Sequence, residues 1–241
     1  MTHEEYVKKV KEILGSYLID RPIDVILTGF KGKFIDVYLL RKVTGNIIFR
    51  NTDRTELTYT TLGNRLHVEV YSRKLKTPER LTGIHILREF NLLPPGYFHN
   101  ALSSVDHLKN PVSILYGDTV TKEGVNAPPI PSRVLYSWAL SIERYENVSK
   151  EITHNALSEQ GTMWDVQEGR QLETLFKNIY MYRGHLLQLV SFYNVSAEEF
   201  IFGLGNILMT RTYGAEDTVN PRNLENKVLV IVGATPFEVP V

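Results

Sequence analysis

The stretch that decides the fold of this chain is SAEEFIFGLGNILMTRTYGAED, residues 196–217. Ser196 and Glu199 have the spacing of a capping box, in which each side chain satisfies a free backbone N–H at the start of a helix. Apolar residues then recur at helical spacing. The pattern predicts a helix over residues 197–210, and Gly214 is placed to end it in a left-handed C-cap.

Two strands flank the predicted helix. Residues 185–193, HLLQLVSFY, and residues 227–233, KVLVIVG, are apolar runs with the length and composition typical of strands. The three segments together predict a β-α-β unit. Gly203 and Gly205 each cost the helix about 1 kcal/mol relative to Ala, so we expect a neighbouring element to pack closely against its backbone.

Local patterns predict further elements elsewhere in the chain. Thr2 and Glu5 form a second capping box, which predicts an amino-terminal helix. Thr77 as N-cap and Pro78 at the first helical position predict a helix over residues 78–90. The remaining expected strands are residues 23–28, 34–43, 47–50, 65–71, 111–117 and 134–142.

The order of these elements defines the expected fold class. Two β-α-β passes suit an α+β fold built on a ferredoxin-like, or RNA-recognition-motif-like, sheet with helices on one face. Residues 94–131 are partly Pro-rich and are predicted to be a peripheral loop region. Residues 151–178 lack a regular apolar period, which is typical of a projecting hairpin or a functional loop. We expect one domain spanning residues 1–241.

Composition limits the possible functions. Lys plus Arg and Asp plus Glu both number 27, so a nucleic-acid site would have to be a local basic patch. The chain has no Cys, which excludes disulfides, thiol catalysis and Cys-ligated zinc. No apolar run reaches the roughly 18–20 residues of a membrane span, and no signal-peptide pattern opens the sequence. We therefore expect a cytoplasmic protein without a membrane partner.

Catalytic motifs are not found in the sequence. The seven His residues include no H-x-x-x-H pair, and there is no nucleophile elbow or phosphate-binding loop. Asp24 and Asp36 lie beside or within strand patterns and are interpreted as structural. We expect no catalytic residue, no cofactor and no enzymatic activity.

Clusters of Lys and Arg are the candidate nucleic-acid-binding residues in this neutral chain. Lys31 and Lys33 lie in a Gly-bearing loop, where ammonium and backbone N–H groups can meet phosphates. A solvated surface is the alternative for each group of cations, and capping of the helix also explains Arg211. Met163 and Trp164 can wedge between bases and stack on them, or Trp164 can be a core residue. The candidate RNA-binding residues are Lys31, Lys33, Arg73, Lys74, Lys76, Arg80, Met163, Trp164, Arg211 and Arg222.

Four segments, taken in order, resemble a known family. They are KTPERLTGIHILREFNLL at 76–93, ILYGD at 114–118, NALSEQGTM at 155–163 and GNILMTRTYGAED at 205–217. Together they are similar to the Csc-type backbone subunit of the subtype I-D CRISPR surveillance complex. That subunit belongs to the Cas-seven branch of the RAMP superfamily.

The resemblance implies a modified RNA-recognition-motif core with a long thumb-like insertion, residues 151–178 here. It implies that copies of the chain stack along a CRISPR RNA, that target DNA is held through the guide, and that other subunits of the type I-D complex are partners. Many relatives look to carry a Cys-rich, zinc-binding insert before the ILYG segment. Residues 95–110 contain His99 and His107 but no Cys, so we expect no metal here.

Two other functions stay open beside this one. A metal-dependent or His-dependent endoribonuclease of the same superfamily would shorten RNA. An assembly protein whose insertion docks on a neighbouring subunit would need no nucleic acid. The leading hypothesis is a non-catalytic CRISPR RNA-binding backbone subunit.

Overall fold

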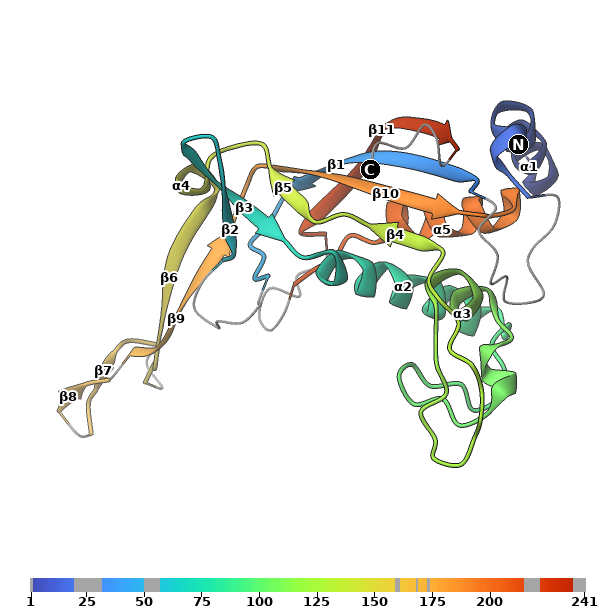
Figure 1. Cartoon of the computed structure of the whole chain (residues 1–241). Helices are drawn as coiled ribbons and strands as arrows, with labels where there is room; N and C mark the ends of the chain where they lie inside the picture. Colours follow the sequence, from blue (N-terminus) through green and yellow to red (C-terminus); the bar gives the residue numbers. More distant parts are fainter. Residues whose placement is uncertain are drawn as a thin grey trace.

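The structure is a computed structural model that describes residues 2–19, 32–49, 57–158, 161–167, 169–172, 174–214 and 222–235. Its helices are α1 (His3–Leu14), α2 (Ser72–Glu89), α3 (Pro111–Tyr116), α4 (Tyr145–Val148) and α5 (Ala197–Met209), with short 3-10 turns η1 (Gly15–Tyr17) and η2 (Val105–Leu108). Its strands are β1 (Phe34–Val43), β2 (Tyr59–Leu62), β3 (Arg65–Val70), β4 (Val134–Tyr136), β5 (Ala139–Ser141), β6 (Ser149–Asn155), β7 (Trp164–Asp165), β8 (Arg170–Gln171), β9 (Thr174–Met181), β10 (His185–Tyr193) and β11 (Leu224–Ala234). Figure 1 shows their arrangement.

The main sheet is antiparallel, and β1 lies between β11 and β10. The strand order is β11-β1-β10-β5-β3-β2, and β4 also pairs with β10. Because β10 and β11 both run antiparallel to β1, they are parallel to each other, with α5 as the connection between them. The predicted β-α-β unit is therefore confirmed, and so is a mixed fold of helices and an antiparallel sheet.

Helices α2 and α5 pack together beneath this sheet, and β10 presses on the backbone of α5. A Cβ atom at Gly203 would lie 2.5 Å from the Phe192 ring, so only Gly fits there. The expected close approach is confirmed at this position. The same expectation is wrong at Gly205, since an added Cβ atom would meet only the end of the Met209 side chain, at 3.8 Å.

The capping boxes of α1 and α5 form as predicted. Thr2 accepts from the N–H of Glu5, Ser196 accepts from the N–H of Glu199, and both glutamates return a bond to the cap. The end of α5 differs from the prediction, because Thr210 is its C-cap and Gly214 lies four residues further on. Gly214 does adopt the left-handed conformation, with φ of 97°.

Two predictions of secondary structure are wrong for reasons of capping and burial. Residues 111–116 form helix α3, because Asn110 caps it by accepting from the N–H of Ser113 and Pro111 opens it. Helix α2 begins at Ser72, so that Pro78 lies inside the helix. The additional turn places Leu75 in a fully buried position, which a reading of caps alone does not reveal.

Two strand predictions also change. The strand expected over 134–142 is divided into β4 and β5 at Ser137, whose N–H donates to the carbonyl of Leu189. Residues 47–49 do not form the expected strand, since Ile47 makes only an isolated bridge to Met181, and Arg50 lies outside the described residues. The strand expected at 23–28 lies outside the described residues.

A two-stranded hairpin projects away from the main sheet (Figure 1). β6 and β9 pair from Ser149↔Met181 to Asn155↔Thr174, and the short pair β7–β8 lies toward its tip. The region 94–131 contains η2, α3 and connecting loops beside α2. Within the described part of the chain, no helix has the length and apolar character needed to cross a membrane.

Candidate nucleic-acid interface

A buried charged network joins α2 to β1 and to the loop after α5. Arg41 of β1 donates from Nη1 to Glu79 Oε1 of α2 and to Asn226 Oδ1 of β11, each at 2.6 Å. Tyr213 donates its hydroxyl to the same Glu79 oxygen at 2.7 Å, and Tyr136 donates to the other at 2.6 Å. Five separate segments are thereby held in one arrangement: β1, α2, β4, β11 and the loop after α5.

The protonation states in this network are firmly set. Burial on its own would lower the pKa of Arg41, but the neighbouring Glu79 and Tyr213 raise it above its ordinary value. Burial and the charge of Glu79 hold the pKa of Tyr213 well above its ordinary value. Arg41 therefore stays charged and Tyr213 stays a donor, so the geometry does not depend on moderate changes of pH.

Four cations lie on the elements that this network fixes, and we call them the basic rim: Arg73 and Lys74 in the first turn of α2, and Arg211 and Arg222 in the loop between α5 and β11. The Arg222 carbonyl accepts from Thr44 Oγ1 at 2.8 Å, and the Arg211 carbonyl accepts from the N–H of Leu224. Both backbone contacts anchor the loop to the main sheet. Figure 1 shows the start of β11 beside the amino-terminal half of α2.

The first turn of α2 is electrostatically unfavourable as it stands. The amino end of a helix carries partial positive charge, which favours acidic side chains and opposes cations. This turn has no acidic residue and carries both Arg73 and Lys74. Burial, followed by the charge of Arg73, lowers the pKa of Lys74. No described residue forms an ion pair with any of the four rim cations, so a bound anion would relieve the repulsion.

Lys76 and Arg80, the other two candidate cations in residues 73–80, face inward. Lys76 donates from Nζ to Ser132 Oγ at 2.6 Å and to the Val134 carbonyl at 3.1 Å. Burial and the charge of Arg80 lower the pKa of Lys76 to about 8. Arg80 pairs with Asp118 at 2.6 Å, and both side chains are largely buried. The structure thus uses Lys76 and Arg80 to join α2 to residues 118–134.

The remaining candidates are distributed over the molecule. Lys33 donates from Nζ to the Leu18 carbonyl at 2.8 Å, whereas Lys31 lies outside the described residues. Met163 and Trp164 lie near the tip of the β6–β9 hairpin, and the Trp164 side chain is 53% exposed. The alternative that Trp164 belongs to the core of the domain is therefore wrong.

His99 and His107 are the two histidines of residues 95–110. His107 is buried, accepts from the N–H of Ser103 at Nδ1 and donates from Nε2 to the Pro95 carbonyl. No group of three or more potential metal ligands occurs among the described residues. His107 has a structural role, since it bridges the two ends of the loop 95–103.

Sequence reasoning did not identify the buried network, although one signal of it was present. Arg41 is in phase with the buried residues Ile35, Val37 and Leu39 of β1. A charge on the buried side of a strand requires a buried partner. The pattern does not say which residue that partner is, because Glu79 belongs to an element far away in the sequence.

The fold is that of subunits found in CRISPR RNA-guided complexes. The structure of Thermofilum pendens Csc2 matches with a TM-score of 0.62 at 15% identity, covering 93% of this chain and 75% of that one. A chain of a CRISPR RNA-guided surveillance complex matches with a TM-score of 0.55 at 10% identity, covering 80% and 66%. A chain of a type IV-B CRISPR complex matches with a TM-score of 0.54 at 12% identity, covering 86% and 95%.

The sequence itself identifies the family. The family model described as Csc2 Crispr matches residues 25–238. The chain therefore belongs to the Csc2 CRISPR family. A comparison with curated proteins finds no match.

Proposed function

We propose that this chain is a non-catalytic backbone subunit of a type I-D interference complex, in which several copies bind along one CRISPR RNA. The observation that carries the proposal is the basic rim. Arg73 and Lys74 repel each other and the helix dipole at the start of α2, so a bound anion would stabilise this arrangement. The phosphates of an RNA backbone are the ligands that such a rim fits.

The topology supports an RNA-recognition-motif core. The order β1, α2, β4 and β5, β10, α5, β11 reads as β-α-β-β-α-β, with β2 and β3 added before α2. The spatial order β11-β1-β10-β5 places the first strand in the middle, as expected for a ferredoxin-like sheet. Membership of the Csc2 family supports the same assignment.

The chemistry of the rim suits phosphate better than base recognition. The guanidinium groups of Arg73, Arg211 and Arg222 can each bind phosphate oxygens through two parallel N–H bonds. Such contacts position a strand without reading its sequence. A backbone subunit that must accept any guide requires this kind of binding, and target DNA would then be held through the guide.

The projecting hairpin supplies the proposed thumb. Its exposed Trp164 and neighbouring Met163 can insert between bases, because an aromatic face stacks on any base. The hairpin extends beyond its own sheet, so its tip is available to RNA and to an adjacent subunit (Figure 1). Other copies of the chain and other subunits of the complex are the proposed protein partners.

The experiment is RNA binding at several salt concentrations. For a single strand, the slope of log K against log salt should change by about 0.7 for each phosphate that a variant no longer neutralises. The double variant Arg73→Ala/Lys74→Ala should therefore lower the slope by about 1.4. The control variant Lys9→Ala/Lys122→Ala removes two exposed cations from α1 and the 118–130 loop and should leave the slope unchanged.

Four results would contradict the proposal. Binding that does not weaken with salt, or an equal effect of the control variant, would exclude the rim. Shortening of the RNA would favour the endoribonuclease. Assembly that is insensitive to ribonuclease would favour a protein that docks without nucleic acid.

A further inference from the structure

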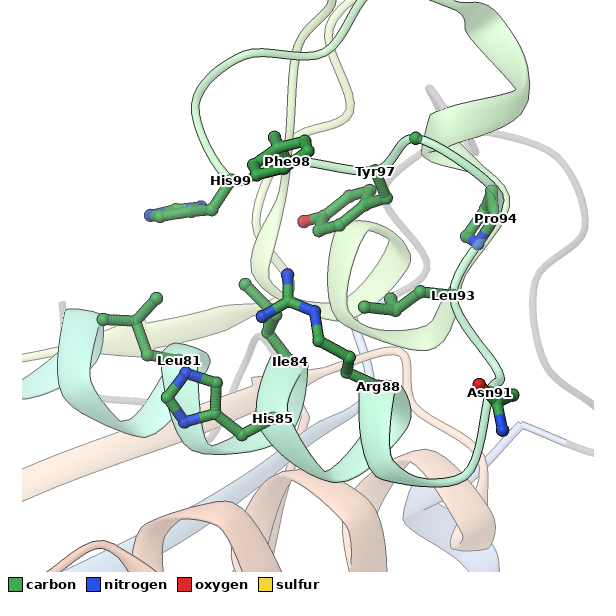
Figure 2. Close-up of a pocket in the computed structure, with 11 residues that line it drawn as sticks. Leu81, Ile84, His85, Arg88, Asn91, Leu93, Pro94, Tyr97, Phe98 and His99 are labelled. Atoms are coloured by element: carbon green, nitrogen blue, oxygen red, sulfur yellow. The ribbon is translucent and has the colours of Figure 1, made fainter.

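A groove lies at the opposite end of α2 from the basic rim (Figure 2). It has a volume of about 440 Å³ and is bounded by the carboxyl-terminal half of α2 and by residues 93–99. Arg73 and Arg88 are fifteen residues apart on one helix, which corresponds to about 22 Å at 1.5 Å per residue. A ligand in this groove would therefore be separate from one on the rim.

One wall of the groove carries hydrogen-bond donors over an apolar base. Leu81, His85 and Arg88 have helical spacing, which places them on one face of α2. In Figure 2 the Arg88 guanidinium points from this face toward the opposite wall. No described residue forms a hydrogen bond or an ion pair with the Arg88 side chain, and no acidic residue lines the groove.

The opposite wall is aromatic. It carries Tyr97, Phe98 and His99 in sequence, and these rings face the α2 side chains in Figure 2. Phe98 is 67% exposed and has no ring partner among the described residues. Nδ1 of His99 is buried and also has no partner there. Burial, and then the charge of Arg80, lower the pKa of His99, so its ring is neutral near pH 7.

We propose that this groove binds one nucleotide of a single-stranded nucleic acid, with the base stacked on Phe98 and a phosphate bound by Arg88. An unpaired guanidinium can bind the phosphate of a nucleotide, and an unpaired aromatic ring opposite it can stack on the base. The volume lies in the range of small-ligand pockets, so it suits a single nucleotide and not a folded protein partner. The proposal adds a second nucleic-acid contact to the subunit and does not depend on the rim.

Asp118 gives the aromatic wall its fixed position. Its Oδ2 accepts from Arg80 Nη2 at 2.6 Å, from Ser113 Oγ at 2.8 Å and from the Tyr97 hydroxyl at 3.2 Å. Tyr97 is buried and directly precedes Phe98. The wall is therefore held at a set distance from α2, as a site for a rigid aromatic base requires.

The test uses the full chain and a twelve-nucleotide strand in which one uridine is replaced by photoreactive 5-iodouridine. The same sequence is used as RNA and as DNA, and cross-linked peptides are mapped by mass spectrometry. We expect cross-links at Tyr97, Phe98 or His99, and we expect them to persist in the Arg73→Ala/Lys74→Ala variant. RNA and DNA are the two possible sources of the strand, and a cross-link with either supports the groove.

Phe98→Ala should weaken the residual binding of the rim variant at least about fivefold, the lower limit for removal of one stacked base. Phe90→Ala is the matched control, since Phe90 is 69% exposed and does not line the groove. Arg88→Gln should lower the salt slope by about 0.7, and Lys9→Gln should not. Cross-links elsewhere alone, or equal effects of Phe98→Ala and Phe90→Ala, would overturn the groove and leave the rim intact. Loss of copy-to-copy assembly without loss of strand binding would identify the groove as a protein contact and overturn it as well.

Discussion

Arg41 Nη1 lies 2.6 Å from Glu79 Oε1, and neither side chain is exposed to solvent. The pair joins β1 to α2, the helix that carries Arg73 and Lys74. Within the described residues, Nε and Nη2 of Arg41 have no hydrogen-bond partner, so Glu79 carries most of the compensation for this buried charge. Glu79 therefore joins the part of the basic rim on α2 to β1.

We predict that Glu79→Ala lowers the free energy of unfolding by about 3–5 kcal/mol, because it leaves a buried charge unpaired. Glu151→Ala is the matched control, since Glu151 pairs with Lys177 at 3.1 Å on an exposed surface. The control should cost less than about 1 kcal/mol. Denaturant unfolding of both variants measures the difference, and equal losses would show that the Arg41–Glu79 pair is not the anchor.

We predict that stability rises as the pH increases from about 8 toward 9.5. The pKa of Lys76 is lowered to about 8 in the folded chain from an ordinary value of 10.5. The unfolded chain therefore binds more protons in this window, and the free energy of unfolding increases with pH. Lys76→Met should reduce this increase, and Lys122→Met, at an exposed lysine, should not. A wild-type curve with the same slope as the Lys76→Met curve would contradict the assignment.

The two glycines of α5 should respond oppositely to the same substitution. Gly203→Ala forces a methyl group into the Phe192 ring and should cost about 1–3 kcal/mol through overpacking. Gly205→Ala meets nothing closer than 3.8 Å and should stabilise the helix by about 0.5–1 kcal/mol. Thermal or denaturant unfolding compares them directly. Losses of similar size at both positions would contradict the packing described for Gly203.

The hairpin tip should affect assembly and not the fold. Met163→Ala/Trp164→Ala removes side chains near an exposed tip, so the melting temperature of the monomer should hardly change. RNA-dependent assembly into larger complexes should fall, as measured by sizing. Ile13→Ala, at an exposed position on α1, is the control. A reduced melting temperature would mean that Trp164 packs into the domain, and undiminished assembly would remove the tip from the RNA contact.

Local signals in the sequence were sufficient for some elements of the sheet and not for others, since β2 was not expected and the strand expected at 134–142 is divided into β4 and β5. Strands at 34–43 and 185–193 and the capping box at Ser196 were predicted correctly because each signal lies within the element itself. The segment 111–117 was predicted as a strand because a short, mostly apolar run fits a buried strand and a short helix equally well. Only the contact between Asn110 and Ser113 distinguishes them.

The candidate site was predicted only in part, because spacing along the chain does not show which way a charge faces. Arg73 and Lys76 are three residues apart, yet Arg73 is exposed and Lys76 bonds to Ser132 and Val134. The partner of Arg41 and the groove beside Arg88 both depend on elements brought together by the fold. Such relationships are set by tertiary packing, and no local pattern contains them.

The position of β1 between β10 and β11 has a consequence for how the protein is made. Phe34 pairs with Tyr193 on one side and with Ala234 on the other, so both partners of this early strand are synthesised last. At 5–20 residues per second, the ribosome needs on the order of 10 s to deliver them after β1 has emerged. During that interval both edges of an apolar strand are open to other nascent chains. We expect the yield of soluble subunit to depend on chaperone supply and growth temperature more than on the final stability of the fold.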